Sequence, residues 1–211
     1  MTSPDRTVER RAFVARLAEA CPSALVVAGL GAPAYDLFAS GDRDGYFYLW
    51  GAMGGAAAMG LGLALAQPAR SVVVLTGDGE QLMGLGALAT VGAQRPANLT
   101  VVVLDNGRYG ETGMQASHTS LGTSLAGVAR SCGFAWAEEV SSVEAVPALA
   151  ERVRARAGCG LAQVLVRAEA LPRTLPPRDG VALRDRFRAA LGLRAGGSPP
   201  GDLRASRRRG A

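Results

Sequence analysis

The sequence predicts an α/β fold, a doubly wound parallel sheet with helices on both faces. Two short β-branched runs, 72–76 and 99–104, have the composition of buried strands. Each run leads directly into a polar, glycine-containing turn, Gly77-Asp78-Gly79 and Asp105-Asn106-Gly107. Segments of strand type also alternate with segments of helix type along most of the chain, which is typical of a parallel sheet.

The chain has 211 residues, enough for one α/β domain with a full core. We expect a single domain over residues 1–195, with a C-terminal extension from about residue 171, and a disordered Arg-rich tail over 196–211. The formal net charge is +5, but four arginines lie in the last eight residues. Without that tail the charge is close to neutral, so nucleic-acid binding is not expected.

The first elements are predicted from capping residues and apolar patterns. Ser3 as a possible N-cap, Pro4 in the first turn and an apolar stripe predict a helix near the start. An apolar run at 24–28 predicts a short buried strand. Residues 33–40 predict a brief helix, which Gly41 closes.

An uncharged segment at 49–67 is about long enough to cross a bilayer. Its residues are mostly small, it contains five glycines, and basic clusters do not flank it. These features favour a strand at 46–50 and a buried helix over 52–66, ended by Pro68, instead of a membrane span. We therefore expect no membrane association.

The rest of the chain repeats the alternation of strands and helices. A strand at 72–76, a helix at 80–94 and a strand at 99–104 precede a polar, glycine-rich loop at 105–121, which its length marks as functional or disordered. The remaining expected elements are a helix at 124–132, a strand at 135–140, a helix at 143–157, a strand at 161–166 and an amphipathic helix at 179–193.

Composition excludes several kinds of chemistry. Every basic residue is Arg, so neither a Schiff-base lysine nor a phosphate-loop lysine is available. The three cysteines are far apart and form no zinc or disulfide pattern. The N-terminus is charged and amphipathic, unlike a signal peptide, and a cytoplasmic location is expected.

The two polar turns predict a cation site. Asp78 and Asn106 follow two strands that we expect to be neighbours, and parallel sheets bind ligands at the carboxyl ends of their strands. Two oxygen ligands beside exposed glycine backbone suit Mg²⁺ that carries a diphosphate. The GxGxxG dinucleotide pattern fails because Leu82 occupies the third glycine position.

Three motifs resemble the diphosphate-binding module of thiamine diphosphate enzymes: GAMG at 51–54, GDG at 77–79 and LDNGRYG at 104–110. The similarity extends over about residues 45–140. It is greatest to the beta subunit of sulfopyruvate decarboxylase and the C-terminal part of phosphonopyruvate decarboxylase.

This resemblance implies roles for individual residues. Asp78 and Asn106 would bind Mg²⁺ through side-chain oxygens, and Arg108 through its backbone carbonyl. Met53 would support the bent cofactor between its two rings, and the Gly51 carbonyl would accept a hydrogen bond from the aminopyrimidine. The implied cofactor-binding residues are Gly51, Ala52, Met53, Gly77, Asp78, Gly79, Glu80, Asn106, Arg108, Tyr109 and Gly110.

Three acidic or titratable side chains lie in or near these motifs. Glu80 replaces the small residue that often follows this triplet, and we expect its carboxylate to turn away from the phosphates. His118 and Glu111, in the polar loop, are candidates for proton transfer. A surface position explains either residue equally well.

The resemblance also implies a partner and a reaction. Enzymes of this group need a second α/β module that binds the pyrimidine and supplies an activating Glu, and this chain has room for one module. We therefore expect a separate pyrimidine-binding subunit and decarboxylation of a small 2-oxoacid to an aldehyde and CO₂. A carboligase related to acetolactate synthase and a non-catalytic cofactor-holding subunit are the alternatives.

Overall fold

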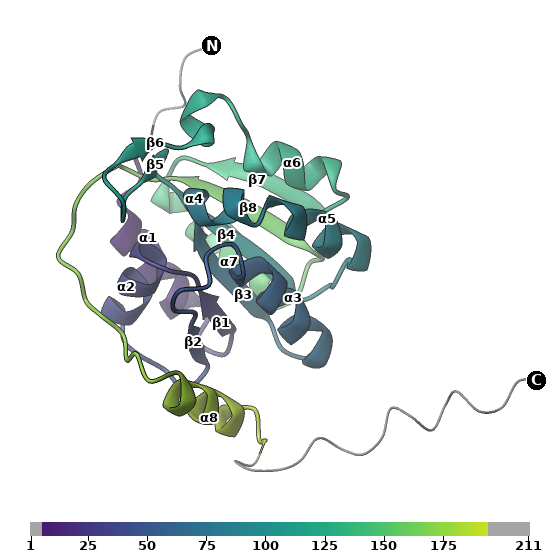
Figure 1. The fold of residues 1–211 in the computed structure, drawn as a ribbon. Helices are drawn as coiled ribbons and strands as arrows, with labels where there is room; N and C mark the ends of the chain where they lie inside the picture. Colours follow the sequence, from purple (N-terminus) through teal and green to yellow (C-terminus); the bar gives the residue numbers. More distant parts are fainter. Residues whose placement is uncertain (1–5, 194–211) are drawn as a thin grey trace, which may run out of the picture.

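The computed structural model describes residues 6–193 and has a six-stranded sheet whose neighbouring strands are all parallel (Figure 1). In sheet order the strands are β2 (Tyr46–Tyr48), β1 (Leu25–Ala28), β3 (Val72–Gly77), β4 (Leu99–Asp105), β8 (Gly160–Leu165) and β7 (Trp136–Val140). The predicted doubly wound α/β fold is confirmed, and β3 and β4 are neighbours as expected.

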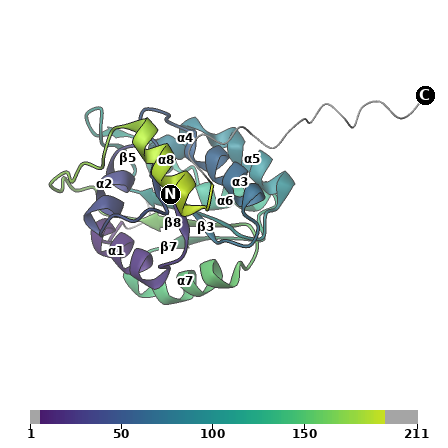
Figure 2. The same ribbon diagram turned by 90° about the horizontal axis from the view of Figure 1, so that it is seen from below.

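Helices cover both faces of the sheet (Figure 2). One layer contains α1 (Arg10–Ala20), α2 (Ala32–Ala39) and α7 (Val146–Ala155), and the other contains α3 (Ala56–Ala66), α5 (Leu85–Gln94) and α6 (Leu125–Ser131). Alternate residues of each strand enter opposite cores. Val73 and Leu75 of β3 join the first layer, and Val72 and Val74 join the second.

The uncharged segment forms a short helix packed on the sheet. Gly60 of α3 lies so close to the Val74 side chain that a Cβ would overlap it. Small residues therefore let this helix approach the strands. Within residues 6–193, no helix is both long and apolar enough to span a membrane.

The first helix begins later than predicted. Ser3 and Pro4 lie outside the described residues, and α1 begins at Arg10 with Glu9 as its cap. The Glu9 carboxylate accepts hydrogen bonds from the backbone N–H groups of Arg11 and Ala12, which would otherwise lack partners.

Three glycines explain two further differences from prediction. Residues 52–55 are not helical, because Gly51 and Gly54 adopt φ values of 70° and 82°. The predicted helix at 80–94 is divided into α4 (Asp78–Met83) and α5. The break is at Gly84, whose backbone contacts that of Gly54.

The polar loop is more ordered than predicted. β5 (Arg108–Tyr109) pairs antiparallel with β6 (Gln115–Ala116), and the short 3₁₀ helix η1 (His118–Leu121) follows. A second 3₁₀ turn, η2 (Val143–Ala145), precedes α7.

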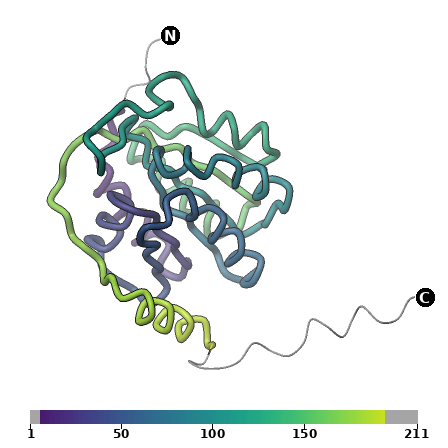
Figure 3. The backbone as a smooth tube through the Cα atoms, viewed as in Figure 1, coloured from purple at the N-terminus to yellow at the C-terminus, as the bar shows by residue number. Residues whose placement is uncertain are grey.

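The C-terminal extension runs along the outside of the sheet. After β8 the chain passes α1 and α2 and ends in α8 (Gly180–Ala190), near the β2 edge (Figure 3). Phe187 of α8 packs edge-on against Phe47 of β2, with ring centroids 5.7 Å apart. The predicted disordered tail, 196–211, lies outside the described residues.

Candidate functional site

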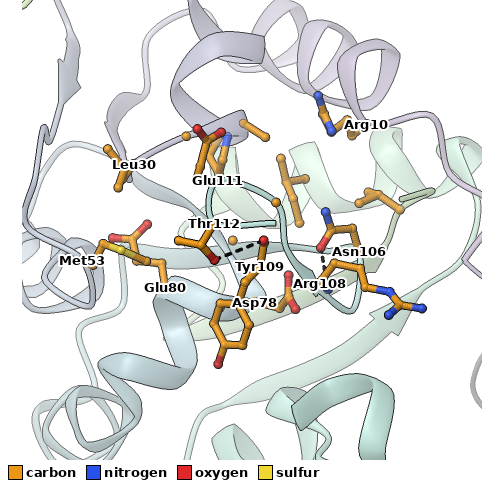
Figure 4. Close-up of a pocket in the computed structure, with 18 residues that line it drawn as sticks. Arg10, Leu30, Met53, Asp78, Glu80, Asn106, Arg108, Tyr109, Glu111 and Thr112 are labelled. Carbon is orange, nitrogen blue, oxygen red and sulfur yellow. Dashed lines mark hydrogen bonds between the residues drawn. The ribbon is translucent and has the colours of Figure 1, made fainter. Parts of the chain in front are cut away.

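A pocket opens at the carboxyl edge of the sheet, where β1, β3 and β4 end (Figure 4). Its lining comes from Arg10, the turn at 30–33, Met53, the turn at 77–80, Leu104, Asn106, residues 108–112 and Val166. The parallel register pairs Gly77 with Leu104, so the residues that follow these two strands emerge side by side. This geometry is the one expected for a ligand site in a parallel sheet.

Most of the predicted site residues meet in this pocket. Ten of them line it: Met53, Gly77, Asp78, Gly79, Glu80, Asn106, Arg108, Tyr109, Gly110 and Glu111. In Figure 4, Met53 and Glu80 lie on one side of Asp78, and Asn106 and Arg108 on the other. Gly51, Ala52 and His118 are exposed and are not among the lining residues.

Asp78 is a buried carboxylate, with 2% of its surface exposed. Its Oδ2 atom accepts a 2.5 Å hydrogen bond from Ser117 Oγ and lies 3.3 Å from Thr119 Oγ1. Burial is the largest cause that raises the pKa of Asp78 to about 6, followed by the neighbouring charge of Asp105. Hydrogen bonds from Ser117 and from the backbone N–H groups of Asp78 and Asn106 act in the opposite direction.

Asn106 is fixed by a short-range turn. Its Oδ1 accepts a 2.9 Å hydrogen bond from the Arg108 backbone N–H. The Asp78 carboxylate and the Asn106 amide oxygen line one pocket and are hard oxygen donors, which fit Mg²⁺. Residues 6–193 contain no cluster of three His, Cys, Asp or Glu side chains arranged to hold a metal. The candidate site at Asp78 differs from such a cluster, because it would use one carboxylate, one amide oxygen and one backbone carbonyl.

The contact with Tyr109 leaves room only for glycine at position 79. A Cβ at this position would lie 2.6 Å from two carbons of the tyrosine ring. The ring therefore packs directly on the backbone of the 77–79 turn, at the start of α4. Backbone N–H groups at such a turn suit phosphate oxygens.

Glu80 points toward the end of β1. Its Oε2 accepts a 2.9 Å hydrogen bond from Thr76 Oγ1, and the carboxylate lies directly over Gly29, where a Cβ would overlap it. Burial raises the pKa of Glu80, while the Thr76 hydroxyl and nearby backbone N–H groups, including that of Gly54, lower it. The carboxylate thus fills the space between β1 and the 51–55 loop.

Glu111 is held by the C-terminal extension. Its Oε2 forms a 3.1 Å ion pair with Arg173, and its side chain packs over Gly31. The Arg173 guanidinium also lies 5.9 Å from the centre of the Tyr35 ring. These contacts support a role for Glu111 in holding the loop against the β1–α2 turn.

A polar network behind Asp78 was not predicted from the sequence. It consists of Arg6, Asp105, Ser117, Thr119 and Gln163, and all but Arg6 are fully or nearly fully buried. One signal was present in the sequence, because Gln163 is a polar residue within an otherwise apolar strand. The turn at 30–33 was also missed, although Gly31 lies shortly after a predicted strand.

The sequence matches the family model described as "Thiamine pyrophosphate enzyme, C-terminal TPP binding domain" over residues 34–168. It is 49% identical to a phosphonopyruvate decarboxylase of Streptomyces hygroscopicus over 118 residues, which are 56% of this chain and 29% of that protein. It is 43% identical to the sulfopyruvate decarboxylase subunit beta of Methanocaldococcus jannaschii over 110 residues, 52% of this chain and 58% of that subunit. The chain thus covers 29% of the length of the first relative and 58% of the length of the second.

Solved structures agree on the fold. Benzoylformate decarboxylase from Polynucleobacter necessarius superimposes with a TM-score of 0.65 and 21% sequence identity, covering 82% of this chain and 36% of that one. The family match and the site geometry lead to one conclusion: this chain belongs to the family of thiamine pyrophosphate enzymes, through their C-terminal TPP-binding domain.

Proposed function

We propose that this chain is the diphosphate-binding subunit of a thiamine diphosphate- and Mg²⁺-dependent 2-oxoacid decarboxylase. The substrate class is sulfopyruvate or phosphonopyruvate, and the products are an aldehyde and CO₂. The observation that carries the proposal is that Asp78 and Asn106 follow adjacent parallel strands and line one pocket. Relatives named for these two decarboxylations support the substrate class.

The residues of the chain would hold the cofactor at its diphosphate end. Asp78, Asn106 and the Arg108 carbonyl would bind Mg²⁺, and the backbone of Gly79 and Glu80 would face the phosphates. When bound, thiamine diphosphate supplies the stabilised carbanion that the reaction requires. The protein's own contribution is orientation and exclusion of water, to which Tyr109 and the hairpin at 108–116 would contribute.

The activating Glu would come from a separate pyrimidine-binding subunit. Relatives named as beta subunits support a heteromeric assembly. Exposed methionines near the pocket also favour a partner at this edge. Met53 is 40% exposed and lines the pocket, and Met83, 62% exposed, lies on the segment that contacts Gly54. Exposed apolar side chains gathered at one site are typical of a protein interface.

Three free cysteines, two of them buried, are compatible with a reducing compartment, and we propose the cytoplasm. His118 is exposed and does not line the pocket, so a role in proton transfer would require the assembled enzyme to bring a substrate to it.

The test is reconstitution. The chain would be purified with and without the product of the neighbouring open reading frame, and CO₂ release from sulfopyruvate and phosphonopyruvate would be measured with thiamine diphosphate and Mg²⁺. We expect turnover only in the combined preparation. Product analysis with an added aldehyde separates decarboxylation from carboligation, and a condensed product as the main outcome would contradict the proposal.

A further inference from the structure

We propose that Ser117 and Thr119 are positioning residues that hold the Asp78 carboxylate for a divalent cation and link it to a second buried carboxylate, Asp105. The inference rests on the proposed function, because it concerns the same cation site. It adds residues that lie behind the pocket and do not line it.

Ser117 fixes the orientation of Asp78. The serine is fully buried, and its hydroxyl donates a 2.5 Å hydrogen bond to Asp78 Oδ2. Its backbone N–H is occupied by the Gly107 carbonyl at 2.9 Å, so the residue is anchored independently of its side chain. The same carboxylate also accepts hydrogen bonds from the backbone N–H groups of Asp78 and Asn106, so it is held in one orientation beside the pocket.

Thr119 joins the two carboxylates. Its Oγ1 lies 2.7 Å from Asp105 Oδ1, 2.9 Å from Ser117 Oγ and 3.3 Å from Asp78 Oδ2. The two hydroxyl protons serve the two shortest contacts, with Ser117 donating to Asp78 and Thr119 donating to Asp105, and the Ser117–Thr119 contact then carries no proton of its own. Each carboxylate thus accepts a hydrogen bond from one hydroxyl.

Asp105 adds negative charge without lining the pocket. It is fully buried, accepts hydrogen bonds from Gln163 Nε2 at 2.7 Å and the Gly107 N–H at 2.9 Å, and forms an ion pair with Arg6 at 3.2 Å. Among the residues that the structure describes, the formal charges of Asp78, Asp105 and Arg6 sum to −1. A divalent cation at Asp78 compensates this charge, so the network favours cation binding.

The network also couples the cation to the loop. Both hydroxyls come from residues that follow the hairpin at 108–116, whereas Asp78 belongs to the neighbouring turn. A cation that fixes Asp78 therefore strengthens the hydrogen bonds that hold the loop, and a disordered loop releases Asp78. Groups behind a metal ligand typically change metal affinity about 10- to 100-fold when removed.

The experiment measures Mn²⁺ binding to the full chain by electron paramagnetic resonance, together with thiamine diphosphate retention by equilibrium dialysis. The variants are Ser117→Ala and Thr119→Val, which remove a hydroxyl, and Thr119→Ser, which keeps it. Thr123→Val is the matched control, because Thr123 lies in the same segment but its hydroxyl is not part of the network. Urea denaturation checks that each variant is folded.

We expect Ser117→Ala and Thr119→Val to weaken Mn²⁺ binding about 10-fold or more, with Thr119→Ser and Thr123→Val close to wild type. Equal weakening by Thr119→Ser and Thr119→Val would overturn the inference, as would unchanged affinity in both hydroxyl-free variants. Should either hydroxyl-free variant fail to fold, the other decides. Failure of the wild-type chain to bind Mn²⁺ would refute the proposed function along with the inference, so the two failures are distinguishable.

Discussion

The ring of Tyr109 packs on the backbone of Gly79, leaving no space for a Cβ, which would lie 2.6 Å from two ring carbons. This contact joins the turn after β3 to the hairpin after β4. The prediction is that Gly79→Ala displaces the ring, lowers the free energy of unfolding by about 1–3 kcal/mol and weakens thiamine diphosphate binding. Urea denaturation and cofactor titration measure the two effects.

The control for this substitution is Gly62→Ala. Gly62 lies within α3, and a Cβ there has no neighbour within 4 Å. We expect this variant to be more stable than wild type by about 0.5–1 kcal/mol, since Ala is favoured over Gly inside a helix. Equal stability and equal cofactor binding in Gly79→Ala and wild type would contradict the close packing.

A second prediction concerns pH and Asp78, whose pKa is raised to about 6 by burial and by Asp105. In the metal-free chain, folded Asp78 keeps its proton at pH values where the unfolded chain has lost it. Its contribution to the free energy of unfolding therefore decreases as pH rises from about 4 to about 6. Asp78→Asn should abolish this decrease, which urea denaturation at several pH values would detect.

Ionisation of Asp78 should affect metal binding and stability in opposite ways: as pH rises through the pKa of Asp78, metal binding should strengthen while its contribution to stability decreases. Mg²⁺ requires the ionised carboxylate, so Mg²⁺-dependent cofactor retention should decline as pH falls through about 6. Retention that does not change between pH 5 and 8, roughly one unit below and two above this pKa, would argue against Asp78 as a ligand.

A third prediction tests the ion pair of Glu111 with Arg173. Both side chains are partly exposed, so Arg173→Ala should change the free energy of unfolding by less than about 1 kcal/mol. The loop should nevertheless open more often, and trypsin should cleave after Arg108 several times faster. Arg154→Ala, which breaks the exposed Arg154–Glu151 pair, is the control and should leave this cleavage rate unchanged.

A fourth prediction concerns the buried charges beside the pocket. Asp36 is fully buried and pairs with Arg10 at 2.6 Å and with Arg11 at 2.9 Å. Asp36→Ala leaves the buried Arg10 without its carboxylate and should destabilise the fold by about 3–5 kcal/mol. Glu144→Ala removes an exposed ion pair with Arg16 and should cost less than about 1 kcal/mol; similar losses in both variants would contradict the difference in burial.

The sequence predicts the fold well because the strands are marked locally. Apolar runs before Asp78 and Asn106 identify β3 and β4, and the turn residues mark the edge where they end. Most of the predicted cofactor residues line one pocket for the same reason. Each lies within a few residues of a strand end, so its location follows from topology.

Features that depend on tertiary contacts were not predictable in this way. The division between α4 and α5 results from the approach of Gly54 to Gly84, residues 30 positions apart. The network of Ser117, Thr119 and Asp105 joins different segments, and nothing in the local sequence shows which hydroxyl meets which carboxylate. Pairing of Glu111 with Arg173 likewise depends on the path of the C-terminal extension.

The most direct measurement is equilibrium dialysis of thiamine diphosphate against the full chain, with Mg²⁺ or with a chelator, for wild type and Asp78→Ala. The account predicts that wild type retains the cofactor only when Mg²⁺ is present, and that Asp78→Ala does not retain it under either condition while remaining folded. Retention by Asp78→Ala equal to that of wild type would contradict the assignment of the metal and diphosphate site.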